Sequence, residues 1–253
     1  MNSPVNHPLE PRRRAIVVGA SSGLGAALVR LLAARRYHVA AVARREAYLA
    51  ELRDSVGRDA VRTYVHDVTE YEQVPMLFDQ ITQDLGGLDL IIYAAAVQPP
   101  VALHEYNFEK DEAMVRTNLL GAIAWLNQAA LRFERARSGQ IVGISSIAGD
   151  RGRVGNPVYN TSKAGLDTYL EALRNRVSRY GVGVTTIKPG FVDTELLKNA
   201  PKTFWVISPE EAAARTYDAI LRRRQLAYVP PRWRLVSLVV SSIPSAIFRR
   251  LNF

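Results

Sequence analysis

The 253-residue chain contains no cysteine, so it can hold neither a disulfide framework nor a thiolate metal site. Histidine is scarce as well. The four residues His7, His38, His66 and His104 are scattered without an i, i+4 pair, and we expect no metal site. The amino terminus lacks an apolar run, because residues 1–13 are polar, proline-rich and basic. We expect a flexible leader there rather than a secretion signal, and a cytoplasmic protein by default.

Acidic residues are outnumbered, since 33 Lys and Arg stand against 24 Asp and Glu, for a formal net charge of +9. Such an excess can indicate nucleic acid, a membrane surface or an acidic substrate as a partner. The arginine triplets 12–14 and 222–224 also fall where cations improve solubility or complement a helix C-terminus. No aromatic-interleaved basic stripe or zinc-finger spacing accompanies them, so we expect no nucleic-acid binding.

Short apolar runs alternate with amphipathic segments along the chain, as in doubly wound α/β proteins. We expect strands at residues 15–18, 38–43, 60–65, 88–94, 140–144, 182–187 and 226–229. We expect helices at 23–35, 46–55, 71–85, 108–137, 157–180 and 209–222. Ser208 and Pro209 give the last helix an N-cap and a first helical residue. The prediction is a single α/β domain over residues 14–229, with a Rossmann-like, seven-stranded parallel sheet and helices on both faces.

A glycine-rich turn joins the first expected strand to the first expected helix. It reads Gly-Ala-Ser-Ser-Gly-Leu-Gly and contributes Gly19, Ser21, Ser22, Gly23, Leu24 and Gly25. The glycines allow a tight turn and a close approach to a pyrophosphate, whose charge a helix N-terminus favours. A purely structural turn is the alternative for this loop alone.

Tyr159 and Lys163 lie four residues apart, so both share one face of the expected helix. A free tyrosine titrates near ~10, and a fixed cation beneath it stabilises the phenolate and lowers this pKa. Such a phenol can act as an acid–base group. Ser146 follows a strand thirteen residues before Tyr159 and can hydrogen-bond the carbonyl oxygen that the tyrosine protonates. A surface Tyr and Lys on an ordinary helix is the alternative for this pair alone.

From about residue 14 to residue 229 the chain resembles the classical short-chain dehydrogenase/reductase family. The resemblance rests on the glycine-rich turn, Ser146, Tyr159 and Lys163, which occur in this order. Three further segments match its pattern: the adenine-contacting pair after the third strand, a mid-chain asparagine that holds a water beside the lysine, and a loop around the nicotinamide. In this chain they supply Asp67 and Val68, then Asn118, then Pro189, Gly190, Val192 and Thr194.

This resemblance implies the roles of the catalytic set. Ser146 orients the substrate carbonyl, Tyr159 donates the proton, and Lys163 lowers the pKa of the phenol and holds the nicotinamide ribose. Asn118 positions a water that relays protons to Lys163. The family spacing selects Ser146 over its neighbour Ser145, which we interpret as structural.

One segment departs from the family. After the fourth strand the family usually has Asn-Asn-Ala-Gly, whereas this chain has Tyr93, Ala94, Ala95 and Ala96. The missing asparagine normally ties strands together and shapes the cofactor floor. It is not a proton-transfer group, so we interpret the change as tolerated and retain Ala94 and Ala95 as cofactor-contacting residues.

The end of the second strand indicates the cofactor. An acidic residue there would bind the adenosine ribose and repel a 2′-phosphate. This chain has Ala43 followed by Arg44 and Arg45, whose guanidinium groups suit a phosphate. We therefore predict NADP(H), with a polar helix start as the alternative role of the two arginines.

The prediction is an NADPH-dependent reductase, or reversibly an alcohol dehydrogenase, of a small-molecule carbonyl compound. Apolar residues after Thr194 suggest a lid over a lipophilic ketone or aldehyde, and Tyr106 and Phe108 are candidates for the same cleft. The alternative is an NADP(H)-sensing binding protein of the same fold, although such proteins usually lack part of the Ser, Tyr and Lys set. The apolar helices 108–137 and 157–180 and the family resemblance predict a homodimer or homotetramer.

Residues 230–253 form a tail beyond the family motifs. Its apolar residues recur at helical spacing between arginines, but the uncharged run is too short to span a bilayer. We expect the tail helix to cover the substrate cleft or a partner subunit. The alternative is a peripheral membrane contact through residues 232–253, with arginines on anionic headgroups.

Overall fold

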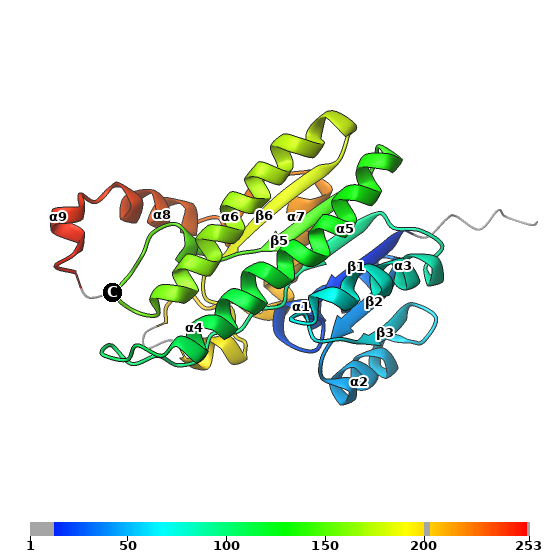
Figure 1. Ribbon diagram of the computed structural model, residues 1–253, viewed down its shortest axis with the longest axis horizontal. Coiled ribbons are helices and arrows are strands. Elements are labelled where there is room, and N and C mark those ends of the chain that lie inside the picture. Colours follow the sequence, from blue (N-terminus) through cyan, green and yellow to red (C-terminus); the bar gives the residue numbers. More distant parts are fainter. Residues whose placement is uncertain (1–12, 200–202, 252–253) are drawn as a thin grey trace, which may run out of the picture.

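The chain forms one parallel sheet that is covered by helices on both faces (Figure 1). The computed structural model describes residues 13–199 and 203–251. Seven strands follow the order β3-β2-β1-β4-β5-β6-β7. They are β1 (Arg14–Val18), β2 (His38–Ala43), β3 (Val61–Val65), β4 (Leu90–Tyr93), β5 (Gln140–Ile144), β6 (Gly183–Pro189) and β7 (Leu226–Val229). The predicted fold class is therefore confirmed.

The strands are apolar throughout because neighbouring residues enter two different cores. Ala15 and Val17 of β1 point into one hydrophobic core, and Ile16 and Val18 point into the other. All four side chains are fully buried. A strand buried on both faces needs a continuous apolar run rather than alternation, and this explains the sequence pattern.

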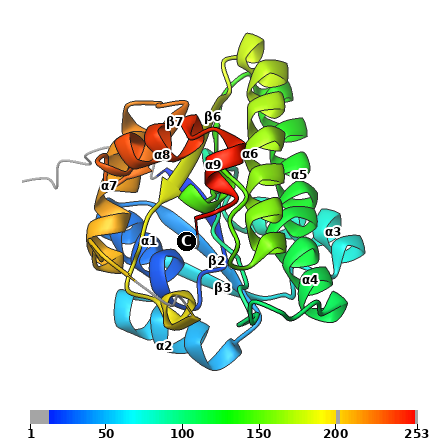
Figure 2. The same ribbon diagram turned by 90° about the vertical axis from the view of Figure 1, so that its left-hand side faces the viewer.

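Two helical layers cover the sheet (Figure 2). The helices α1 (Gly23–Ala34), α2 (Glu46–Val56) and α7 (Pro209–Leu221) contribute to the first core. The helices α3 (Val74–Asp84), α5 (Gly121–Ala136) and α6 (Pro157–Val177) contribute to the second. The chain turns from one side of the sheet to the other between β1 and β4, so a ligand crevice is expected at the carboxyl ends of these strands.

The predicted helix at 108–137 is interrupted. α4 (Phe108–Val115) and α5 are joined by a π-helical turn, η2 (Arg116–Leu120). The final predicted residue, Arg137, instead takes a left-handed conformation with φ of 51° and ends α5. Such π turns are frequent at functional sites.

Other predicted bounds shift by a few residues. The helix expected at 71–85 starts with a 3-10 turn, η1 (Tyr71–Gln73), and its α-helical part has proline in the first turn. The one expected at 157–180 ends as a 3-10 turn, η4 (Ser178–Tyr180). The strand expected at 88–94 is shorter, and Asp89, just before it, accepts hydrogen bonds from the backbone and guanidinium of Arg14. Ser208 caps α7 as predicted, accepting from the Glu211 backbone at 3.1 Å.

The tail forms two short helices, α8 (Trp233–Ser242) and α9 (Ser245–Phe248), with Pro244 between them. They lie at the left end of the molecule in Figure 1. Arg151 fastens this pair, since its guanidinium donates to the Val240 carbonyl at 2.8 Å and lies 4.0 Å from the Phe248 ring centre. No helix in the described ranges is long and apolar enough to cross a membrane. Residues 1–12 of the predicted leader and residues 252–253 of the predicted tail lie outside those ranges.

Candidate active site

A cavity of about 1640 Å³ opens at the carboxyl edge of the sheet. Its wall begins at the glycine-rich turn, passes the ends of β4 and β5, and closes on α8. Pockets for one small ligand usually measure about 300–1,000 Å³, so this cavity has room for a dinucleotide together with a substrate. Most of the predicted site residues line it: Gly19, Ser21, Ser22, Gly23, Leu24, Gly25, Arg44, Arg45, Val68, Ala94, Ala95, Ser146, Tyr159, Lys163, Pro189, Gly190, Val192 and Thr194.

The glycine-rich turn brings a bare helix end to the cavity. Gly19 has φ of 89°, and a Cβ there would overlap the backbone of Ala95, so only glycine lets β1 and β4 approach this closely. The Ser22 side chain does not cap α1, and the first turn of α1 carries no acidic residue. The free N–H groups of a helix start favour an anion. This end of the cavity fits a pyrophosphate.

Two arginines gather at the end of β2. Arg45 donates to the hydroxyl of Ser21 at 2.9 Å and to that of Ser22 at 2.6 Å, and its guanidinium stacks on Tyr48. Arg44 is paired with Asp67 at 3.3 Å, and its side chain is 58% exposed. Asp67, predicted to contact the cofactor, is outside the cavity lining and instead caps the following turn through Thr69. The arginines and hydroxyls together offer donors to a phosphate.

Tyr159, Ser146 and Lys163 together line one wall of the cavity. The Lys163 ammonium lies 5.8 Å from the centre of the Tyr159 ring. Burial raises the pKa of Tyr159, while Ser146 and the charge of Arg153 lower it. Burial lowers the pKa of Lys163 to about 8 against the opposing charge of Asp167. The ammonium donates to the Ile144 carbonyl at 3.0 Å.

Asn118 lies in η2 and is fully buried, outside the cavity lining. Its amide accepts from the Val97 backbone at 2.8 Å and donates to the Val97 carbonyl at 3.0 Å and to Ser162 at 3.1 Å. These contacts tie η2 to the loop after β4 and to α6. Its expected role in holding a water beside Lys163 stays a prediction.

The sequence around Ala94 lacks the family asparagine, but Tyr93 ties the same region together. Its buried hydroxyl donates to the Thr117 carbonyl in η2 at 2.6 Å. The link joins β4 to the π-helical turn, where Thr117 also lines the cavity. The altered motif therefore keeps a polar connection between the sheet and η2.

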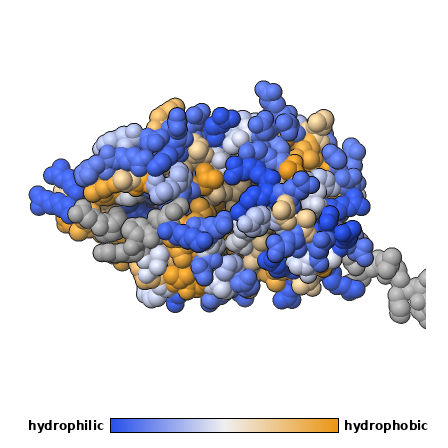
Figure 3. Space-filling model, turned by 90° about the horizontal axis from the view of Figure 1, so that it is seen from below, coloured by the Kyte–Doolittle hydropathy of each residue, from blue (hydrophilic) through white to orange (hydrophobic). Residues whose placement is uncertain are grey.

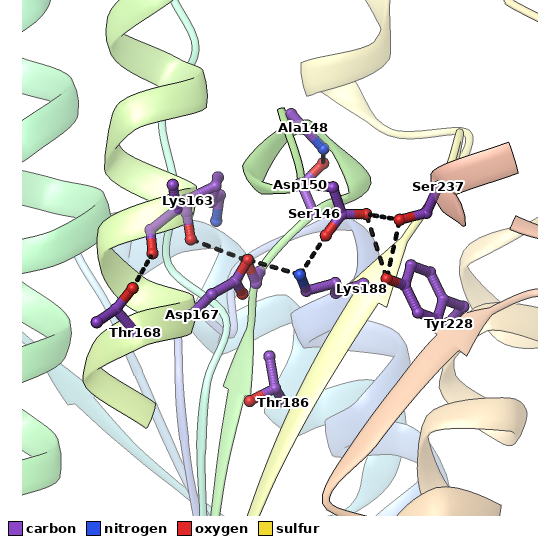
Figure 4. A network of polar contacts seen from close by, with 12 residues as sticks. Ser146, Ala148, Asp150, Lys163, Asp167, Thr168, Thr186, Lys188, Tyr228 and Ser237 are labelled. Atoms are coloured by element: carbon purple, nitrogen blue, oxygen red, sulfur yellow. Dashed lines mark hydrogen bonds and ion pairs between the residues drawn. The ribbon is translucent and has the colours of Figure 1, made fainter. Parts of the chain in front are cut away.

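A buried network of charges leads away from Lys163 (Figure 4). Lys188 of β6 forms ion pairs with Asp167 of α6, at 2.8 Å, and with Asp150. Asp150 also accepts from Ser237 of α8 at 2.5 Å and from Tyr228 of β7 at 3.3 Å. Burial raises the pKa of Asp167, and the ion pair with Lys188 opposes this. Burial alone lowers the pKa of Lys188, but the two carboxylates raise it above its ordinary value.

The tail closes one side of the cavity, as the sequence predicted for its helix. Trp233, Val236, Ser237 and Val240 of α8 line it. Gly190 makes this possible, because a Cβ at that position would overlap the Trp233 indole. The predicted lid contributes Leu196, Leu197 and Phe204. Tyr106 and Phe108 do not line the cavity and are 95% and 78% exposed, so their expected place in the cleft is wrong.

Comparison with known proteins identifies the family. The sequence profile described as short chain dehydrogenase matches residues 13–204. An uncharacterized oxidoreductase of Myxococcus xanthus is 33% identical over 240 residues, covering 93% of this chain and 94% of the relative. The protein belongs to the short-chain dehydrogenase family. The resemblance predicted from the sequence is thereby confirmed.

Other relatives agree with this assignment. An uncharacterized oxidoreductase of Mycobacterium tuberculosis is 30% identical over 224 residues, covering 87% of this chain and 88% of the relative. Among solved structures, ElxO with NADP bound has a TM-score of 0.78 at 20% identity, covering 86% of this chain and 96% of that one. A short chain dehydrogenase/reductase family protein has the same TM-score at 22% identity, covering 87% and 97%. These two structures support the fold of the short-chain dehydrogenase family.

Several residues of the site escaped the sequence interpretation. Arg153 lies beside Tyr159, and Asp150 and Asp167 hold Lys188 from two different elements. Nothing in their local sequence marks them, because each is a single charged residue whose partners are distant along the chain. The tail residue Ser237 is hidden in the same way within an apolar helix.

The buried Lys163 gives the first prediction. Its pKa of about 8 lies below that of an unfolded lysine, so the unfolded state binds more protons between these values. The free energy of unfolding therefore gains a contribution from Lys163 as pH rises through that window. We expect the unfolding free energy of the wild type minus that of Lys163→Met to increase by about 2 kcal/mol from pH 7 to pH 10. Urea unfolding of both proteins at several pH values measures this difference in unfolding free energy. A difference that stays constant with pH would contradict the lowered pKa of Lys163.

Proposed function

We propose that this protein is an NADPH-dependent reductase of a lipophilic carbonyl compound, and reversibly an alcohol dehydrogenase. The observation that carries the proposal is the meeting of Tyr159, Ser146 and Lys163 at one cavity wall. A phenol that shares a cavity wall with a serine hydroxyl and an ammonium is an acid suited to a carbonyl oxygen. The oxidoreductase names of the relatives are consistent with this reaction.

The residues of the cavity fit NADP(H). The uncapped start of α1 and the glycine-rich turn suit the pyrophosphate, and Val68 suits the adenine. Arg44 and Arg45, with the hydroxyls of Ser21 and Ser22, suit a 2′-phosphate. Pro189, Gly190, Val192 and Thr194, with Ala94 and Ala95, form the wall that would hold the nicotinamide. The NADP bound to ElxO supports the same assignment.

When bound, the nicotinamide supplies the hydride. The Ser146 hydroxyl donates a hydrogen bond to the substrate carbonyl oxygen and holds it near Tyr159. The Tyr159 hydroxyl then gives its proton to that oxygen. The Lys163 ammonium stabilises the resulting phenolate and would hold the nicotinamide ribose of the bound cofactor. A water near Asn118 would return a proton through Lys163.

Part of the wall around the proposed substrate space is apolar. Val236 and Val240 of α8 and Leu196, Leu197 and Phe204 of the lid surround it. Phe204 packs edge-on against Phe191, with ring centres 5.5 Å apart. Such a wall gains free energy by removing an apolar chain from water. A lipophilic ketone or aldehyde fits this environment.

We also propose that residues 14–229 form the catalytic domain, with residues 230–253 as an appended tail, in a cytoplasmic homodimer or homotetramer. Leu120 and Leu131, on the helices that the family uses for assembly, are exposed in the single chain. The outward face of α8 carries exposed Leu235, Leu238 and Val239. The exposed Arg232 and Arg234 precede them in the chain, and the exposed Arg249 and Arg250 follow. Hydrophobic and hydrophilic surfaces lie side by side at this end of the molecule, left in Figure 3. This face suits an anionic bilayer surface, into which the leucines insert.

The proton donor provides the central test. Tyr159→Phe should lower kcat with NADPH by a factor on the order of 10²–10⁴, because it removes the acid and leaves the ring in place. NADPH affinity, measured by cofactor fluorescence, should stay unchanged. Tyr169→Phe is the matched control on the same helix, since Tyr169 bonds Asn127. Full activity of Tyr159→Phe would refute the mechanism, and no turnover over a broad carbonyl panel would favour a cofactor sensor.

Cofactor choice depends on Arg44. Arg44→Asp should shift the ratio of kcat/KM for NADPH to that for NADH by about 10- to 100-fold toward NADH, because attraction for a phosphate becomes repulsion. Arg44→Ala should give a smaller shift in the same direction. The control Arg58→Asp changes an exposed arginine that pairs with Asp54, and it should leave the ratio unchanged. Tighter binding of NADH than NADPH by the wild type would overturn the assignment.

Sedimentation tests the tail and the assembly together. In solution the wild type should sediment as a dimer or tetramer. Mixed with phosphatidylglycerol vesicles, it should pellet with them at low salt but not at high salt. Exchanging two exposed leucines, Leu235→Ser with Leu238→Ser, should weaken vesicle binding by at least about 10-fold. Leu221→Ser on α7 is the control. Protein that stays in the supernatant excludes the membrane contact, and a monomer at micromolar concentration excludes the assembly.

A further inference from the structure

Arg153 lies in the cavity wall beside the proton donor, in the loop between β5 and α6. Its positive charge acts on the phenol of Tyr159. The loop is fixed to α6, because Asn160 donates to the Arg153 carbonyl at 3.3 Å. This contact fixes the backbone of the loop, and the Arg153 side chain lines the same cavity as Ser146 and Tyr159.

This guanidinium makes no hydrogen bond or ion pair with the residues that the structure describes, and its Nε is buried without a partner. Burial lowers the pKa of Arg153, against the charges of Tyr159 and Asp150. Asp150 is the nearby acid, but Lys188, Ser237 and Tyr228 already occupy its carboxylate. The side chain as a whole is partly exposed, but a buried guanidinium N–H without an acceptor is costly. This unused donor therefore marks a place for an anion from outside the chain.

The neighbouring Arg151 shows the contrast. It lies two residues away and is satisfied by the carbonyls at the end of α8, as described above. Arg151 thus has a structural role, whereas Arg153 has donors that remain unused. Arg151 therefore holds the tail in place, whereas Arg153 is available to bind a ligand.

We propose that Arg153 binds a carboxylate of the substrate, so that the enzyme acts on an oxo acid with an apolar chain. This proposal rests on the proposed carbonyl reduction and names its substrate class. A planar guanidinium binds a carboxylate through two parallel hydrogen bonds. One unpaired cation neutralises a single negative charge, so a carboxylate fits better than a doubly charged phosphate. The apolar residues Val236 and Val240 accommodate the rest of the chain.

The reaction then converts an oxo acid to a hydroxy acid. The carbonyl carbon gains a hydride and forms a C–H bond, and the carbonyl oxygen gains the Tyr159 proton and forms an O–H bond. The carbonyl compound is reduced, and NADPH is oxidised to NADP⁺. The carboxylate is unchanged, because it serves only to place the carbonyl against Tyr159 and Ser146.

Matched substrates test the proposal. Medium-chain oxo acids with the carbonyl at successive positions are compared with their methyl esters, which keep the chain and lose the charge. For the best acid we expect the wild type to show a kcat/KM about 10- to 100-fold above that of its ester. Arg153→Leu should remove this preference, and Arg153→Lys should keep part of it. Arg116→Leu, which removes another cavity arginine, should leave the acid-to-ester ratio unchanged.

The ratio of kcat/KM for the acid to kcat/KM for its ester distinguishes carboxylate binding by Arg153 from an effect of Arg153 on Tyr159. If Arg153 served only to lower the pKa of Tyr159, then Arg153→Leu would slow acid and ester equally and shift both pH profiles. That result, or a wild type that prefers esters, overturns the proposal.

A binding measurement does not depend on turnover. Calorimetry with an unreactive alkanoate and the matching alkanamide should show alkanoate binding to the wild type and at least about 10-fold weaker binding to Arg153→Leu. Equal affinity for the two compounds refutes the carboxylate site even if the enzyme reduces ketones. Selective alkanoate binding without any carbonyl reduction would instead refute the proposed function and leave the site standing.

Discussion

The burial of the Lys163 ammonium is the constraint on which the site depends. A cation only 2% exposed is stable in the fold only if its surroundings compensate for lost water. The Ile144 carbonyl supplies one acceptor, and Asp167 supplies an opposing charge. Asp167 is itself buried and needs Lys188, which in turn needs Asp150. Each charge is acceptable because the next one balances it, so β5, β6 and α6 are held in one geometry.

This chain of charges also explains why the tail belongs to the cavity. Asp150 accepts from Ser237, so the last carboxylate of the network fixes the inward face of α8. Trp233 then lies against Gly190, in the loop that would hold the nicotinamide. α8 is therefore positioned by the polar contacts of Ser237 and by the close packing of Trp233. A substitution in the tail is therefore expected to affect the cofactor-binding wall through Trp233. It is also expected to affect Lys188 through Asp150.

Local patterns in the sequence were sufficient for most of the fold. The strands are apolar runs buried on both faces, and Ser208 with Pro209 predicts the start of α7 because capping depends only on neighbouring residues. Tyr159 and Lys163 were found because helix spacing alone brings them together. Arg153 and Asp150 were not found from the sequence. Their roles depend on which distant residues they contact, and no local spacing shows those contacts. The exposure of Tyr106 likewise depends on how the loop before α4 folds back, which no local spacing encodes.

The distribution of arginines bears on the excess positive charge of the chain. Arg44 and Arg45 line the cavity after β2, whereas Arg153 lines it in the loop between β5 and α6. In the proposed complex the first two face the phosphate of the cofactor, and the third faces the carboxylate of the substrate. Their charge then serves two different anionic groups in the same cavity. Field lines focused in such a cleft raise the local concentration of both ligands. A basic chain without a nucleic-acid motif is consistent with this use of charge.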